Sequence, residues 1–129
     1  MRRSLHFVPG GNEKMIQKAL TLPADGLILD LEDAVTSDKK AATRPVVRRW
    51  LETLDFGKRE RWVRMNPIFG EYGEADLEET IAGRPDGYVV PKPRRAEDIR
   101  RIAAILERLE QKHGLPFGST RLQLIATET

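Results

Sequence analysis

The stretch Gly26-Leu27-Ile28-Leu29-Asp30-Leu31-Glu32-Asp33-Ala34-Val35 decides the fold. A short apolar run that begins after a glycine and ends at acidic residues is typical of a strand buried on both faces, as in parallel sheets. Residues that follow the carboxyl ends of such strands form the active sites of parallel α/β folds. Helix capping would explain one acid, but Asp30, Glu32 and Asp33 are more than a cap needs. We therefore interpret this stretch as a buried strand with a candidate functional site at its end.

Strand-like and helix-like segments alternate along the whole chain. Short apolar runs predict strands, and apolar residues at three- and four-residue spacing predict helices. Asn12 is the expected N-cap of the first helix, and Ser37 or Asp38 that of the second. Pro45 indicates either a first-turn proline or a break in the second helix. The expected strands are 5–9, 26–31, 61–65, 88–90 and 122–126, and the expected helices are 13–22, 37–54, 75–82 and 96–113.

Five strands alternating with four helices predict a parallel sheet with right-handed crossovers. A TIM (β/α)8 barrel needs roughly 250 residues, so the 129 residues match about its first half. We expect one partial barrel domain over residues 1–129, with five strands and four helices and with the C-terminal part absent. A flavodoxin-like five-stranded sheet fits the length better, but it would normally finish with a helix.

Composition excludes several classes of partner. The 22 basic and 20 acidic residues nearly balance, and aromatic residues make up 6% of the chain, which argues against a nucleic-acid partner. The absence of cysteine excludes disulfides and thiolate metal sites and fits a reducing compartment. The start has no apolar signal-peptide core, and no apolar run approaches the roughly 18 residues that span a bilayer. We expect a cytoplasmic protein without a membrane partner.

Parallel strands would bring their carboxyl ends to one rim of the sheet. Carboxylates without cysteine or clustered histidine favour oxygen ligation of a hard cation such as Mg²⁺. The planar fork of Arg64 can bind a carboxylate or a developing oxyanion, although an internal salt bridge to Asp30 or Asp33 is the alternative. The expected rim residues are Phe7, Pro9, Asp30, Glu32, Asp33, Arg64, Asn66, Lys92 and Glu128.

Other charged residues have simpler interpretations. Lys92 and the pairs Lys39-Lys40 and Arg94-Arg95 are most simply solvent-exposed charges. His6 and His113 have no partnering pattern, and we interpret both as structural. Pro9-Gly10-Gly11 alone is weak evidence for a phosphate-binding loop.

Five segments in the correct order resemble the citrate lyase β-subunit-like family of HpcH/HpaI aldolases, which includes malyl-CoA and citramalyl-CoA lyases. A sixth segment, residues 12–18, resembles the CoA-ester lyase branch of that family. The resemblance covers most of the chain, and the five segments together are far more specific than any one of them. They are residues 3–10, 28–35, 63–67, 84–92 and 124–129.

This resemblance implies a complete (β/α)8 barrel that uses Mg²⁺ to cleave or form a carbon–carbon bond in a 3-hydroxyacyl-CoA. Malyl-, citramalyl- or citryl-CoA would yield acetyl-CoA, or a relative, and a 2-oxo acid. The family also implies a homo-oligomer, either a trimer or a hexamer.

The resemblance assigns roles to individual residues. Glu128 is similar in position to a metal-binding carboxylate, and Arg64 to the substrate-binding arginine. Glu32 and Asp33 are the candidate catalytic acids beside Arg64 because of their position after the buried strand, apart from the resemblance. A second metal ligand and an acid/base Asp are expected beyond Thr129. The candidate CoA-binding residues are Lys14, Lys18, Phe7 and Pro9.

Two other functions remain open from the sequence. With the same fold, the protein could be a metal-dependent aldolase for free 2-oxo acids or a lyase for acyl-carrier-protein thioesters; Lys14 and Lys18 favour CoA over a free acid. Alternatively, the chain is a truncated, non-catalytic module that binds CoA or a nucleotide, or that assembles with another half-barrel.

Overall fold

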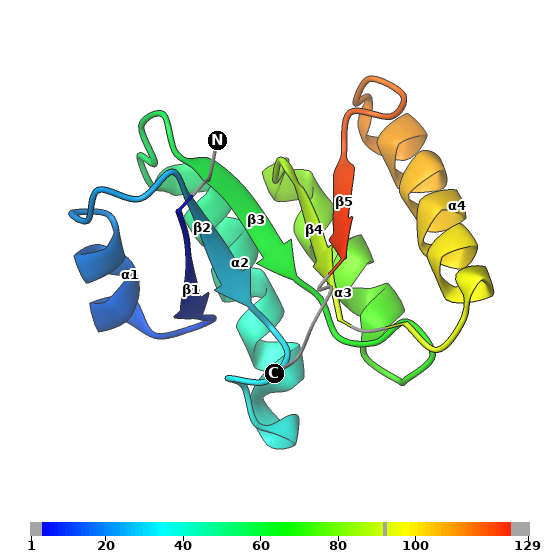
Figure 1. Cartoon of the computed structure of the whole chain (residues 1–129), viewed down its shortest axis with the longest axis horizontal. Coiled ribbons are helices and arrows are strands. Elements are labelled where there is room, and N and C mark those ends of the chain that lie inside the picture. The colour runs from blue at the N-terminus through cyan, green and yellow to red at the C-terminus, as the bar shows by residue number, and fades with distance from the viewer. Residues whose placement is uncertain (1–3, 92, 125–129) are drawn as a thin grey trace.

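The computed structural model describes residues 4–91 and 93–124, and its five strands form one parallel sheet (Figure 1). The strand order is β1-β2-β3-β4-β5, so each strand pairs with the next in the chain. This order confirms the predicted barrel-type winding, because a flavodoxin-like sheet reverses its winding direction at a switch point. The strands are β1 (Leu5–Pro9), β2 (Gly26–Asp30), β3 (Glu60–Arg64), β4 (Gly87–Val90) and β5 (Arg121–Leu124).

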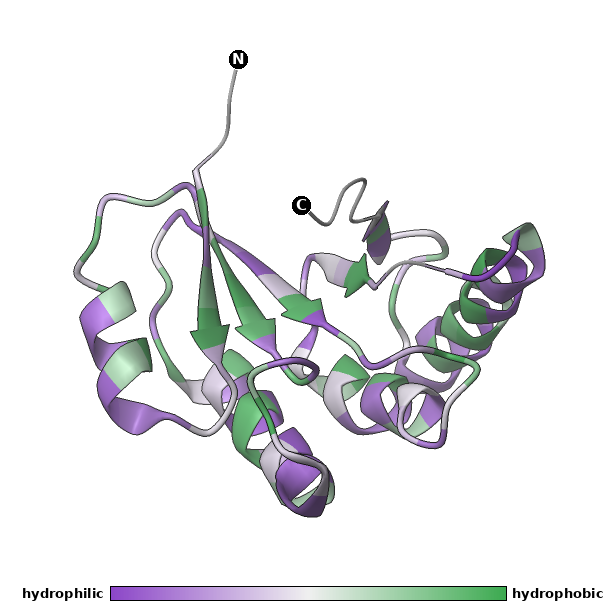
Figure 2. Cartoon of the chain, turned by 60° about the horizontal axis from the view of Figure 1, so that its bottom comes forward, coloured by the Kyte–Doolittle hydropathy of each residue, from purple (hydrophilic) through white to green (hydrophobic). Residues whose placement is uncertain are grey.

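Four α-helices cover one face of the curved sheet, and in Figure 2 they surround its outer side. In the described part of the chain, no helix is long and apolar enough to cross a membrane. The helices are α1 (Glu13–Ala19), α2 (Lys40–Thr53), α3 (Gly73–Thr80) and α4 (Ala96–His113), and the short 3₁₀ helices are η1 (Ser37–Lys39) and η2 (Ile81–Gly83).

The two faces of the sheet have separate apolar clusters. Leu27 and Leu29 of β2 belong to the large cluster beneath the helices. Ile28, between them, belongs to a small cluster with Trp62 and Val89 on the other face, which is the interior face in a barrel. All five residues of β2 are buried, so the prediction of a strand buried on both faces is confirmed.

The turn after β1 is pressed against the end of β2. The Gly10 amide donates a hydrogen bond to the Asp30 carbonyl at 2.8 Å. A Cβ atom at Gly10 would lie 2.7 Å from Thr43 Cγ2 and 2.8 Å from the Asp30 carbonyl oxygen, so only glycine fits without displacing neighbours. This contact places the start of α1 beside the carboxyl ends of the strands.

The helix starts agree with the sequence in part. Asn12 caps α1, since its side chain accepts a hydrogen bond from the Met15 amide at 3.1 Å. The prediction that Ser37 or Asp38 caps α2 is wrong: both lie in η1, which leads directly into the helix.

Pro45 behaves in neither of the two predicted ways. It lies beyond the first turn of α2, and the helix continues to Thr53. A proline removes one backbone hydrogen bond, that to the carbonyl four residues earlier. Here that residue is Ala41, which is exposed, so its carbonyl can bond to water instead.

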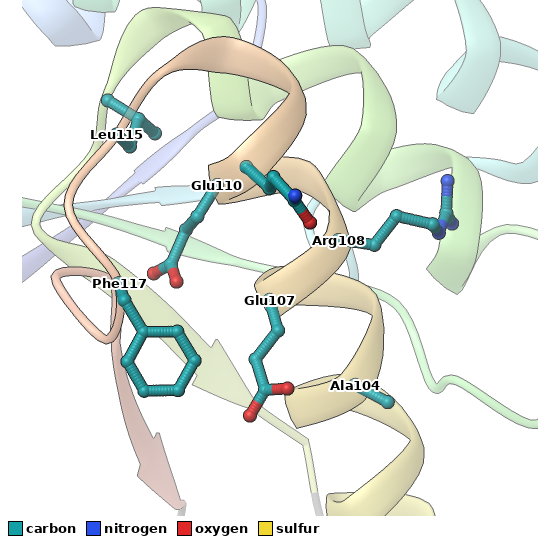
Figure 3. A pocket seen from close by; sticks show the side chains of 7 residues that line it. Ala104, Glu107, Arg108, Glu110, Leu115 and Phe117 are labelled. Atoms are coloured by element: carbon teal, nitrogen blue, oxygen red, sulfur yellow. The ribbon is translucent and has the colours of Figure 1, made fainter.

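A pocket of about 520 Å³ lies between α4 and the loop that leads to β5 (Figure 3). That loop is at the amino ends of the strands, away from the acidic residues that follow β2. The Glu110 carboxylate accepts hydrogen bonds from the Gly118 and Thr120 amides, both at 2.9 Å, so it holds its own loop in place. The lining residues are Ala104, Glu107, Arg108, Glu110, Gln111, Leu115 and Phe117.

Candidate functional site

The carboxyl ends of the first three strands bring an arginine, an aspartate and a phenylalanine together. In the sheet, Pro9 pairs with Asp30 and Asp30 pairs with Arg64. Asp30 accepts two hydrogen bonds from the Arg64 guanidinium, from Nε at 2.9 Å and from Nη2 at 2.6 Å. The Phe7 ring lies over the same guanidinium, with 4.6 Å between its centre and Cζ. One edge and one face of Arg64 are therefore fixed by the protein.

Asp30 also shapes the loop that follows β2. Its Oδ1 atom accepts a hydrogen bond from the Glu32 amide at 2.8 Å, and Oδ2 accepts one from the Ala34 amide at 3.3 Å. The alternative interpretation of Arg64, an internal salt bridge to Asp30, is thus confirmed. A capping role for one of the acids is also partly right, since Asp30 caps amides of a loop rather than of a helix.

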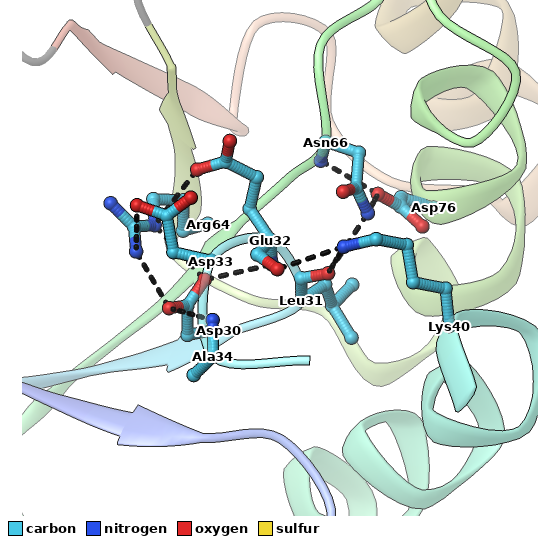
Figure 4. A network of polar contacts seen from close by, with 9 residues as sticks. All are labelled: Asp30, Leu31, Glu32, Asp33, Ala34, Lys40, Arg64, Asn66 and Asp76. Atoms are coloured by element: carbon cyan, nitrogen blue, oxygen red, sulfur yellow. Dashed lines mark hydrogen bonds and ion pairs between the residues drawn. The ribbon is translucent and has the colours of Figure 1, made fainter. Parts of the chain in front are cut away.

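Glu32 and Asp33 both lie close to the same guanidinium (Figure 4). Glu32 Oε1 lies 3.7 Å from Arg64 Nε, and Asp33 Oδ2 lies 3.7 Å from Arg64 Nη2. Burial, and secondly the negative charge of Asp33, raise the pKa of Glu32. A carboxyl group with a raised pKa beside a fixed cation is suited to holding a proton at a reaction centre.

The guanidinium of Arg64 keeps part of its binding capacity. Its hydrogen bonds to Asp30 raise its pKa further, so it is permanently charged. Among the described residues, its hydrogen bonds and ion pairs use only Nε and Nη2. The Nη1 end is left to bind a carboxylate or an oxyanion.

Sequence reasoning missed the polar residues beneath this loop. It interpreted Lys40 as a solvent-exposed charge, whereas Lys40 is only 9% exposed. It placed Asn66 on the rim, whereas Asn66 is buried beneath the loop and donates to the Leu31 carbonyl at 2.9 Å. Asp76 is fully buried and binds Asn66, and its sequence position alone does not indicate this. The periodicity of α2 was the available signal, because its buried residues are Lys40, Thr43, Val47, Trp50 and Leu51.

The two lysines of α1 lie on the exposed surface of that helix. Lys14 and Lys18 are both exposed and stand one helical turn apart. Lys18 lines a pocket of about 210 Å³ together with Phe7 and Met15. Lys14 and Pro9 do not line this pocket, so the pocket itself holds two of the four candidate CoA-binding residues, Phe7 and Lys18. The remaining lining residues are His6, Val8, Ala19 and Leu22.

The described residues do not fit a Mg²⁺ site by themselves. Within 4–91 and 93–124, no group of three or more histidine, aspartate or glutamate residues is arranged to hold a metal ion. The carboxylates of Asp30, Glu32 and Asp33 instead converge on Arg64. The predicted metal ligand Glu128 lies outside the described residues, as does Lys92.

Solved structures with the same fold include two enzymes. A malate synthase of Haloferax volcanii, in a lead(II) complex, superposes with a TM-score of 0.81 at 19% identity, covering 96% of this chain and 40% of its own. A citrate lyase of Burkholderia xenovorans LB400 superposes with a TM-score of 0.80 at 22% identity and with the same coverage. The chain thus has the fold of part of a TIM barrel.

Curated relatives match at higher identity. A (3S)-malyl-CoA thioesterase of Cereibacter sphaeroides is 42% identical over 104 residues, which are 81% of this chain and 36% of that protein. Citrate lyase subunit beta of Escherichia coli K12 is 37% identical over 121 residues, which are 94% of this chain and 40% of that protein. The chain therefore spans well under half the length of these relatives. The family model of the HpcH/HpaI aldolase/citrate lyase family matches residues 3–129, and the chain belongs to that family.

Proposed function

We propose that the full-length protein is a Mg²⁺-dependent carbon–carbon lyase that acts on a 3-hydroxyacyl-CoA. Malyl-, citramalyl- and citryl-CoA are the candidate substrates, and the products would be acetyl-CoA, or a relative, and a 2-oxo acid. The observation that carries the proposal is Arg64, fixed by Asp30 and Phe7 with its Nη1 end unused among the described residues. Family membership supports the reaction class. A homo-oligomeric state and a cytoplasmic location remain predictions.

The residues around Arg64 suit this chemistry. Cleavage leaves an enolate on the thioester and a new carbonyl on the 2-oxo acid, so negative charge develops on oxygen. A fixed cation in a partly buried site stabilises such charge without moving during the reaction. Glu32, with its raised pKa, is a candidate to hold the proton that the 3-hydroxyl group loses. Asp33 would act through its charge, because it is 75% exposed and lies near Arg64.

The direct test is a panel of malyl-, citramalyl- and citryl-CoA given to the full-length protein with Mg²⁺. Formation of a 2-oxo acid together with an acyl-CoA product supports the proposal. No conversion of any of the three esters would contradict it.

Thioester hydrolysis is the second candidate, favoured by the 42% identity to a (3S)-malyl-CoA thioesterase. The same panel separates the two reactions by their products. Hydrolysis releases free CoA, which a thiol reagent detects, and leaves the hydroxy acid intact. Carbon–carbon cleavage releases the 2-oxo acid and keeps the thioester.

We predict that Glu128 is a metal ligand. Glu128→Gln keeps the shape of the side chain but removes its charge, so Mg²⁺ affinity and turnover of the full-length protein should fall together. Titration calorimetry measures Mg²⁺ binding independently of activity. Mg²⁺ affinity equal to that of the unchanged protein would contradict the assignment.

We predict that Lys14 and Lys18 bind the phosphates of CoA. Changing both to Glu should raise KM for a CoA ester about tenfold, since each exposed charge pair contributes up to about 1 kcal/mol. The difference should shrink as salt is added. A pantetheine thioester without nucleotide phosphates should be nearly unaffected.

Lys39 and Lys112, also exposed, supply the control for this double change. Changing both to Glu alters the net charge equally but should leave KM for the CoA ester unchanged. If the Lys14/Lys18 variant loses activity equally on the CoA ester and the pantetheine thioester, these lysines support the fold instead. That outcome would reopen the aldolase for free 2-oxo acids as an alternative.

A further inference from the structure

A buried lysine holds the backbone of the acidic loop from below. Lys40 Nζ donates hydrogen bonds to two consecutive carbonyl oxygens, that of Leu31 at 3.1 Å and that of Glu32 at 2.8 Å (Figure 4). The ring of Tyr72 lies 5.7 Å from the same ammonium group. An ammonium group can serve two carbonyls at once, because it is a compact charge with three donors.

A second donor reaches the same backbone from the segment that follows β3. The Leu31 carbonyl also accepts a hydrogen bond from Asn66 Nδ2 at 2.9 Å. Asp76 fixes Asn66 in turn. Asp76 Oδ2 accepts hydrogen bonds from the backbone amide and from the side-chain Nδ2 of Asn66, each at 2.7 Å. Arg44 Nε donates to the other oxygen of Asp76 at 2.7 Å. The Leu31 carbonyl is thus anchored with or without Lys40. The Glu32 carbonyl accepts a hydrogen bond from the Val35 amide at 3.2 Å within the loop itself, and Lys40 ties this carbonyl to α2.

The two sides of the loop are held by different groups. Asp30 binds the amides of Glu32 and Ala34, while Lys40 binds the carbonyls of Leu31 and Glu32. These bonds together fix the peptide planes on both sides of Glu32. The orientation of those planes decides whether the side chains of Glu32 and Asp33 stand beside Arg64.

We propose that Lys40 is a positioning residue for the acidic site: its ammonium group fixes the loop so that the Glu32 and Asp33 carboxylates meet Arg64. Lys40 contacts neither carboxylate in the described structure and acts through the backbone. The structural part of this proposal stands alone, and only its consequence for turnover rests on the proposed lyase function.

The test compares Lys40→Met with Lys39→Met in the full-length protein. Both variants lose one positive charge, but Lys39 is exposed and Lys40 is buried. Hydrogen exchange of peptides covering residues 31–35 should be about tenfold faster in Lys40→Met, the scale expected when a hydrogen bond to a charged group is lost. Peptides from β4 should exchange as before, and Lys39→Met should exchange normally throughout. If Lys40→Met does not fold, Lys40→Gln replaces it in the same comparison with Lys39→Met. Glutamine keeps a hydrogen-bond donor, but a shorter and uncharged one.

The activity arm uses the ester that the full-length protein converts. Lys40→Met should lower kcat about tenfold with little change in KM, and should shift the acidic limb of the pH profile, since the environment of Glu32 changes. Unchanged exchange at 31–35 relative to Lys39→Met would overturn the proposal, as would equally faster exchange in all peptides, which indicates a general loss of stability. If the unchanged protein converts no ester, the proposed function fails, but the exchange experiment still decides the role of Lys40.

Discussion

Asp30→Ala should lower the free energy of unfolding of the full-length protein by about 3–5 kcal/mol, the cost of leaving one partner of a buried ion pair without the other. The Asp30 side chain is 3% exposed and that of Arg64 is 13% exposed, so water cannot replace the lost carboxylate fully. The loop amides of Glu32 and Ala34 lose their acceptors as well. Denaturant unfolding at neutral pH measures the change.

Two further variants identify the cause of this loss. Asp30→Asn keeps the shape and one acceptor oxygen, so it should lose less stability than Asp30→Ala. In the double variant Asp30→Ala/Arg64→Met, no guanidinium is left buried without its partner, and part of the stability should return. A double variant whose loss equals the sum of the two single losses would show that the pair is not coupled.

The scaffold could be predicted from the sequence because its signals are local. The apolar run before Asp30 predicted a strand buried on both faces, and all five residues of β2 are buried. The spacing of apolar residues predicted α4, which spans Ala96–His113 as expected. The convergence of Arg64 with the acids after β2 followed from the parallel arrangement, since parallel strands end at the same rim.

The support beneath the site could not be predicted in the same way. Lys40 is buried because the carbonyls of Leu31 and Glu32 supply acceptors, and that contact joins a helix to a loop. Asp76 lies in the first turn of α3, where an acid ordinarily serves the helix dipole. Its actual partners, Asn66 and Arg44, come from other elements. No local pattern reveals such tertiary contacts, although the helical phase of α2 places Lys40 on the buried face.

Arg64→Lys should lower kcat of the full-length protein on its CoA ester about 100-fold, the scale of losing one oxyanion donor. Lysine keeps the positive charge but has no planar fork. It cannot bind both oxygens of Asp30 and still present a second edge to substrate. Because the lost interaction acts on the developing charge, KM should change much less than kcat. Steady-state kinetics of the variant measure both constants.

Arg61→Lys is the matched control, because it makes the same substitution at the other end of β3. Arg61 donates to the backbone carbonyls of Leu51, Gly83 and Arg84, away from the rim that holds Arg64. This variant should lose stability but keep its kcat at temperatures where it is folded. If Arg64→Lys shows near-normal kcat and only a raised KM, Arg64 holds the substrate without stabilising the transition state. If both variants lose kcat equally, the loss comes from the strand, and the role of Arg64 in the chemistry is contradicted.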